Sequence, residues 1–250
     1  MAAALKAGKH WQRKGIGRAA MRPWESSTFA DRAAAGVALA RALQRRSLPG
    51  SVLVLALPRG GVPVAYEVAR TLRVPLDVIL VRKVPLPGQA ELAMGAIASG
   101  DVVVREARLA QEIPNFAQTF ARVAERERRE LERRELAYRS GLAPLDLKGK
   151  TVVLIDDGLA TGSTMLAAIR AARQLGAATI VVAAPVASHE GADLVKAEAD
   201  DVVILEIPAV LYAIGAWYED FEQLEDADVT RLLALSRRSL NEDADTAKPR

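Results

Sequence analysis

The middle of the chain reads Val152-Val153-Leu154-Ile155-Asp156-Asp157-Gly158-Leu159-Ala160-Thr161-Gly162-Ser163-Thr164. Its first four residues continue a nearly uninterrupted apolar run, which is typical of a strand buried on both faces of a parallel sheet. Two adjacent carboxylates follow, then a short turn rich in glycine and hydroxyl groups, and a helical pattern that stops at Gly176. This order predicts a buried strand, a ligand-binding turn and a helix.

The turn carries groups that suit a 5-phosphorylated ribose. Free amides at a helix start bind phosphate, and Gly162 lets the backbone approach the ligand closely. Asp156 and Asp157 would repel a phosphate, so they suit sugar hydroxyls or Mg²⁺ held through water. The turn after this strand lacks the Gly-Lys-Ser/Thr of a Walker loop. The plainer alternative is a capped helix after a strand, with no ligand.

Four further apolar runs, before and after the central segment, resemble its strand. They are rich in β-branched residues and cover Val52–Leu57, Leu76–Val81, Thr179–Ala184 and Val202–Leu205. Helical patterns lie between them, including one over 31–46 that Asp31 can cap. Alternating strands and helices predict an α/β fold with a doubly wound, mainly parallel five-stranded sheet.

Two segments depart from this alternation. Residues 93–104 predict a β-hairpin, and residues 117–139 predict a long charged helix. Within 121–139, seven Arg alternate with five Glu, which favours a solvated helix lying across the domain. The alternative, an Arg-lined helix that binds nucleic acid, is weakened because the interleaved Glu residues cancel most of its field.

The charge is unevenly distributed along the 250 residues. Lys and Arg total 34 against 31 Asp and Glu, yet residues 1–24 contain six basic residues and no acidic one. Residues 25–250 therefore carry a net charge of −3, which argues against duplex binding. We expect a basic leader over 1–24 (disordered, or upstream of the true start), a domain over 25–240 and a disordered tail over 241–250.

No apolar run reaches the roughly 18 residues that a membrane span requires. The chain has no cysteine, which fits a reducing cytoplasm. The sequence therefore predicts a cytoplasmic protein with no membrane partner.

The central segment resembles the phosphoribosyl-diphosphate (PRPP) signature of type I phosphoribosyltransferases. Other segments resemble a bacterial subgroup of stand-alone phosphoribosyltransferase-domain proteins: Phe29–Arg32, Leu55–Pro63, Val81–Lys83, Met94–Ala98 and Gly215–Phe221. The resemblance covers roughly residues 28–236. It implies a small hood around 206–236 that covers the acceptor, with the hairpin and charged helix as an insertion.

The resemblance also implies which residues bind PRPP. The turn after Val52–Leu57 would be the pyrophosphate loop, and the basic pair after Leu76–Val81 would neutralise the same group. The implied PRPP-binding residues are Arg59, Gly60, Gly61, Arg82, Lys83, Asp156, Asp157, Ala160, Thr161, Gly162, Ser163 and Thr164. Of these, Asp156, Asp157, Arg59 and Lys83 would be catalytic. Alternatively, Arg59 is a surface residue of a plain turn, and Arg82 and Lys83 form a solvated pair.

The sequence does not determine the chemical identity of the acceptor. The hood residues Glu206, Tyr212, Trp217 and Tyr218 would contact it, although these rings could instead close a small hydrophobic lobe. Enzymes that use 6-oxopurines usually have a carboxylate where this chain has Ala160, so the turn is more similar to the adenine and uracil branches. Glu206, Glu219 and Asp220 are the candidates for a general base.

These observations predict an Mg²⁺-dependent enzyme that transfers 5-phosphoribosyl from PRPP to a small nitrogenous acceptor and releases pyrophosphate. The alternative is a non-catalytic regulatory protein that binds PRPP. An inert relic of the fold is a third reading, but intact Asp156, Asp157 and Arg59 argue against it. Homodimers are common in the family.

Overall fold

The computed structural model describes residues 28–246. The predicted leader over 1–24 lies outside these residues, as do the last four residues of the predicted tail. The last helix, α7 (Asp226–Thr246), includes residues 241–246, so the chain is helical there rather than irregular.

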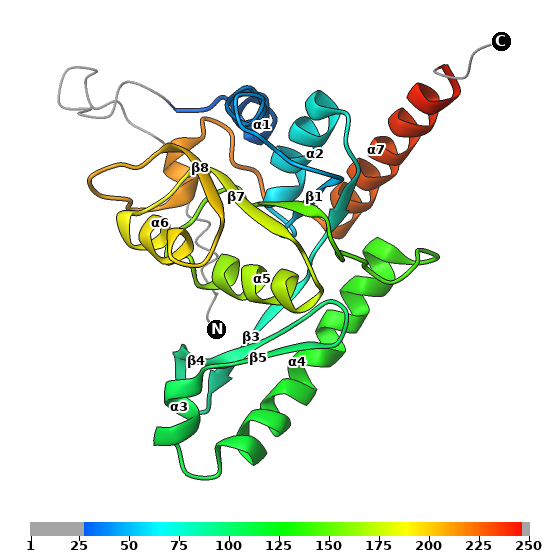
Figure 1. The fold of residues 1–250 in the computed structure, drawn as a ribbon. Helices are drawn as coiled ribbons and strands as arrows, with labels where there is room; N and C mark the ends of the chain where they lie inside the picture. The colour runs from blue at the N-terminus through cyan, green and yellow to red at the C-terminus, as the bar shows by residue number, and fades with distance from the viewer. Residues whose placement is uncertain (1–27, 247–250) are drawn as a thin grey trace, which may run out of the picture.

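The centre of the fold is a parallel sheet of five strands in the order β2-β1-β6-β7-β8 (Figure 1). The strands are β1 (Val52–Ala56), β2 (Leu76–Val78), β6 (Thr151–Ile155), β7 (Thr179–Val186) and β8 (Asp201–Glu206). All residues of β6 are buried, as a strand covered on both faces must be. The predicted α/β class and five-stranded parallel sheet are confirmed.

Helices cover both faces of this sheet. On one face, α1 (Arg32–Leu43), α2 (Gly61–Leu72) and α7 pack over side chains such as Val153 and Ile155. On the other face, α5 (Ser163–Gln174) and α6 (His189–Lys196) pack over side chains such as Leu154 and Val182. Alternate residues of each strand thus belong to two separate cores.

A second, antiparallel sheet of three strands lies beside α5 (Figure 1). It consists of β3 (Val81–Leu86), β4 (Gln89–Ala98) and β5 (Val102–Arg105), which includes the predicted hairpin. The predicted single strand Leu76–Val81 is wrong, because β2 ends at Val78. Ser99 binds Leu80 through its amide and its hydroxyl, at 3.0 and 3.1 Å, and so draws the chain into the second sheet.

After β5 come the short helix α3 (Ala107–Glu112) and the long helix α4 (Phe116–Arg139). The buried residues of α4 are Phe116, Phe120, Ala124, Leu131 and Tyr138. These side chains pack against the second sheet and α7. Charged side chains of α4 pair with each other or with other elements, as Arg139 does with Asp77. The predicted charged helix is therefore present, and one apolar stripe fixes its position.

Between β8 and α7 the chain is irregular apart from a short 3-10 helix, η1 (Ile214–Trp217). Residues 226–236, the last part of the predicted hood, instead form the start of α7 and pack against α2 and β2. In the part of the chain that the structure describes, no helix is long and apolar enough to cross a membrane.

Asp31 caps α1 as its position before the helix predicts. Its carboxylate accepts a hydrogen bond from the Ala34 amide at 2.7 Å. Replacing Asp31 by alanine should lower the free energy of unfolding by about 1 kcal/mol, because that amide loses its partner. Urea unfolding measures the change, and Asp31→Asn should retain most of the stability. An alanine variant as stable as wild type would show that the cap contributes nothing.

Candidate active site

Two turns meet at the carboxyl edge of the parallel sheet. Strands β1 and β6 are neighbours, with Ala56 opposite Ile155, so the turns that follow them lie side by side. The approach is close: a Cβ on Gly60 would lie 2.1 Å from the Asp157 carboxylate oxygen Oδ2. A side chain on Gly60 would displace the Asp157 carboxylate, so the structure brings the two predicted turns together.

The turn after β1 contains a cis peptide bond between Pro58 and Arg59. The Gly61 amide, predicted to bind an anion, instead donates to the Leu57 carbonyl at 3.1 Å. In the part of the chain that the structure describes, the amides of Arg59 and Gly60 remain available.

The turn after β6 leads into the start of α5. Gly162 adopts a φ of +72°, and a Cβ there would lie 2.9 Å from the Gly191 carbonyl oxygen. Glycine has no side chain to cap α5, and the Ser163 amide makes only a long hydrogen bond of 3.4 Å to the Thr161 hydroxyl, so the first turn of α5 can bind an anion. The hydroxyls of Thr161 and Ser163 are 3.0 Å apart, and Thr164 follows on the helix. The geometry therefore fits the predicted phosphate site.

The two carboxylates of this turn have different surroundings. Asp157 is buried and accepts a hydrogen bond from Nε of Arg32 at 2.8 Å. Asp156 is partly exposed, and its Oδ1 accepts from the Asp157 amide at 2.9 Å. Asp157 is thus held by a cation, whereas Asp156 is the carboxylate open to a ligand.

The pKa values of both carboxyls are raised. Burial is the largest cause for each, since it disfavours the charged form. The charge of Asp157 raises the pKa of Asp156 further, while the hydrogen bond from Arg32 opposes the rise at Asp157. The pair is therefore destabilising when both are ionised and no cationic ligand is bound.

Arg32 is a site residue to which the sequence alone assigned no role. Its side chain is only 11% exposed, it donates to the Glu222 carbonyl at 2.9 Å, and its guanidinium lies 3.7 Å from the Phe221 ring centroid. It belongs to the segment Phe29–Arg32, which carried part of the family resemblance. Its partner Asp157 lies 125 positions away, so no local pattern could have joined them.

Tyr218 is placed differently from the prediction that it contacts the acceptor. Its hydroxyl donates to the Asp157 carbonyl at 2.6 Å, and its ring lies between Phe29 and Phe221, at 5.7 and 5.1 Å. The residue is 6% exposed, and burial is the largest cause that raises its pKa. Tyr218 thus holds the backbone of the acidic pair through its hydroxyl, and its buried ring is not accessible to an acceptor.

The other predicted hood residues differ in exposure. Tyr212 is 86% exposed, Trp217 is half-buried in η1, and half-buried Glu206 ends β8. The Glu206 carbonyl accepts from the Ala187 amide at 3.0 Å, which anchors the start of the hood.

Arg59 faces the start of α7. Its Nη1 lies 3.9 Å from Oδ1 of Asp226, and both side chains are about one-third exposed. Asp226 has shorter bonds with Tyr138 Oη and Arg133 Nη1, at 2.5 and 3.0 Å. Arg59 can therefore exchange its weak contact for another anion without leaving Asp226 unpaired.

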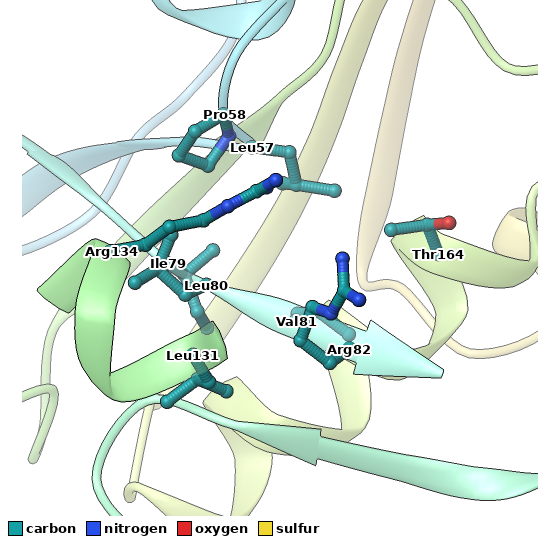
Figure 2. Close-up of a pocket in the computed structure, with 9 residues that line it drawn as sticks. All are labelled: Leu57, Pro58, Ile79, Leu80, Val81, Arg82, Leu131, Arg134 and Thr164. Carbon is teal, nitrogen blue, oxygen red and sulfur yellow. The ribbon is translucent and has the colours of Figure 1, made fainter. Parts of the chain in front are cut away.

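The predicted basic pair Arg82 and Lys83 is divided between two faces of β3. Arg82 points into a narrow cleft that Pro58 and Thr164 also line, and it forms an ion pair with Glu127 at 2.5 Å (Figure 2). Lys83 is exposed and does not line this cleft. Successive strand residues point to opposite faces, so the structure does not bring Lys83 to the site with Arg82.

One carboxylate of the turn after β6 suits a magnesium ion that is bound together with a phosphate ligand. Among the described residues, no three His, Asp or Glu side chains form a metal cluster. Mg²⁺ is often bound by one or two carboxylates together with substrate phosphates. Asp156 fits this pattern because it is partly exposed beside the phosphate turn, whereas Asp157 is already bound by Arg32.

Known proteins resemble this chain over most of its length. The family model described as "Phosphoribosyl transferase domain" matches residues 33–211. A Mycobacterium tuberculosis protein named "Putative phosphoribosyl transferase" is 40% identical over 214 residues, which are 86% of this chain and 48% of that protein. This chain thus spans about half the length of that relative. The crystal structure of TT1426 from Thermus thermophilus has 45% identity and a TM-score of 0.76, covering 82% of this chain and 97% of TT1426.

Proposed function

Because this chain belongs to the phosphoribosyl transferase family, we propose that it transfers 5-phosphoribosyl from PRPP to a small nitrogenous acceptor and releases pyrophosphate. The observation that carries this proposal is the contact between the two turns, in which the Asp157 carboxylate lies against Gly60. One turn offers anion-binding amides beside an arginine, and the other offers a helix start beside a carboxylate. PRPP has the complementary groups, since it bears a diphosphate, a ribose diol and a 5-phosphate.

The arrangement suggests how each part of PRPP is held. The 5-phosphate binds at the start of α5, where Thr161, Ser163 and Thr164 add hydroxyls to the open amides. The ribose hydroxyls donate to Asp156. The diphosphate binds to the amides of Arg59 and Gly60 and to the Arg59 guanidinium.

This placement fits the charge changes of the reaction. As the bond from C1 to the diphosphate breaks, positive charge develops on the ribose and negative charge on the leaving group. Arg59 and the adjacent amides stabilise the leaving group, and the remote 5-phosphate fixes the position of the reacting carbon. A bound Mg²⁺, with Asp156 as its protein ligand directly or through water, would neutralise part of the diphosphate charge.

The acceptor must lose a proton when its nitrogen attacks C1. Ala160 cannot accept that proton, so we assign this role to one of the hood carboxylates Glu206, Glu219 and Asp220. The half-buried position of Glu206 at the end of β8 supports it among these. We place the reaction in the cytoplasm and in nucleotide metabolism, with adenine and uracil as the first acceptors to test.

Pyrophosphate release tests the proposed function. Purified protein with PRPP, Mg²⁺ and a pool of nucleobases should release pyrophosphate, and mass spectrometry should find one new phosphoribosylated product. The reaction without acceptor is the matched control. Tight PRPP binding without product would favour the regulatory alternative instead. Failure to bind PRPP at all would exclude both functions.

A further inference from the structure

The insertion contributes a second arginine to the cleft beside the pyrophosphate turn. The cleft is lined by Leu57, Pro58, Ile79, Leu80, Val81, Arg82, Leu131, Arg134 and Thr164. Figure 2 shows Arg134 extending from α4 toward Leu57 and Pro58, while Arg82 points from β3 into the space before Thr164. The Arg134 guanidinium thus lies beside Pro58, the residue that precedes Arg59, and Arg82 lines the same cleft from β3.

Arg134 is only partly neutralised by its neighbours. Its Nε donates to Glu130 at 2.8 Å, and its side chain is 24% exposed. Glu130 also pairs with Arg133, and Asp226 is shared by Arg133 and Arg59. Three guanidiniums therefore face two carboxylates, which leaves an excess of one positive charge beside the turn.

The buried hydroxyl of Tyr138 connects this group to Arg59. Burial raises the pKa of Tyr138 to about 12, with the hydrogen bond to Asp226 as the next cause. The charges of Arg134 and Arg59 both oppose that rise. The Tyr138 hydroxyl donates to Asp226, and the Arg59 guanidinium lies 3.9 Å from the same carboxylate, so Arg59 and the helix that carries Arg134 meet at Asp226.

We propose that Arg134 of α4 binds the diphosphate of PRPP, together with Arg59 and Arg82. This inference rests on the proposed function and adds a residue of the insertion to its site. The cleft itself has a volume of only about 20 Å³, which is room for roughly one water molecule. The diphosphate would lie at its mouth, where the terminal nitrogens of Arg134 can form paired hydrogen bonds to phosphate oxygens.

Calorimetry with three ligands tests this role. Replacing Arg134 by glutamine should weaken the binding of Mg²⁺–PRPP and of inorganic pyrophosphate by about tenfold to a hundredfold, because charged hydrogen bonds are lost. Binding of ribose 5-phosphate, which lacks the diphosphate, should stay within about twofold of wild type. Arg134→Lys should recover part of the affinity, since lysine keeps the charge but not the planar fork.

Arg128→Gln is the matched control. Arg128 lies on the same helix and pairs with Asp101, away from the cleft, so its replacement should leave all three affinities unchanged. Thermal unfolding shows whether Arg134→Gln folds. If it does not, Arg134→Lys replaces it in the test, and its affinity should fall for PRPP and pyrophosphate but not for ribose 5-phosphate. If the wild type binds PRPP and the Arg134 variant binds it equally well, the proposed function stands and this inference is wrong. Equal losses for all three ligands also overturn it, whereas a wild type that binds no PRPP overturns the proposed function with it.

Discussion

Replacing Arg32 by methionine is expected to lower the free energy of unfolding by about 3–5 kcal/mol. The Arg32 and Asp157 side chains are 11% and 13% exposed, so the variant leaves a carboxylate buried without its cation. Methionine keeps part of the apolar contact with Phe221, which limits the loss from packing. Urea unfolding at pH 7 measures the change.

A double variant separates the unpaired charge from the lost packing. Arg32→Met with Asp157→Asn should recover much of the stability, because no buried charge then lacks a partner. Arg46→Met is the exposed control: its ion pair with Asp201 is 3.7 Å long, and its loss should cost less than about 1 kcal/mol. If the double variant is no more stable than Arg32→Met, the unpaired charge is not the cause.

Replacing Asp156 by asparagine should weaken PRPP binding by about a hundredfold and make the free protein more stable. Binding weakens because a carboxylate accepts stronger hydrogen bonds from a sugar diol than an amide does. Stability rises because the variant removes a carboxylate whose burial and whose neighbour Asp157 both disfavour its charged form. A variant that loses affinity but gains stability indicates that the original residue serves binding at a cost to the stability of the fold.

The stability gain should depend on pH in a definite direction. A carboxyl whose pKa is raised by folding holds its proton more tightly in the folded state, so wild-type stability falls as pH rises above the unfolded value of about 4. Asparagine does not titrate, so the gain should be present at pH 7, shrink as the pH falls toward the unfolded value of about 4, and stay constant below it. Urea unfolding in metal-free buffer measures it, with the exposed Asp193→Asn as control. A variant that binds PRPP like wild type would remove the role of Asp156 at the ribose.

The local sequence pattern was sufficient to predict the elements that depend on residues close to one another in the chain. The buried run before Asp156 and the glycine and hydroxyls after it predict strand, turn and helix, and these are present. The break between β2 and β3 was missed because Leu76–Val81 is an apolar run that only Asp77 interrupts. It depends on Ser99, which binds Leu80 from 19 positions away.

The parts of the site that sequence could not place depend on contacts between distant residues. Tyr218 has an aromatic ring that could stack on an acceptor. Instead, its hydroxyl donates to the Asp157 carbonyl and its ring packs against Phe221. Arg134 was one of seven arginines in a charged helix, and only the packing of α4 shows which one faces Pro58. The family resemblance indicated the motifs, whereas the tertiary structure selected among their residues.

The pairing of β1 with β6 also has a consequence for how the chain folds. Val52 lies opposite Thr151, so two adjacent central strands are separated by 99 positions. Closing a flexible loop of that length has a length-dependent entropic cost of about 4 kcal/mol. A hairpin and a long helix can form within this segment from local contacts, which shortens the flexible chain before the strands meet. During synthesis, the turn after β1 must wait for roughly a hundred more residues before the turn that completes its site exists.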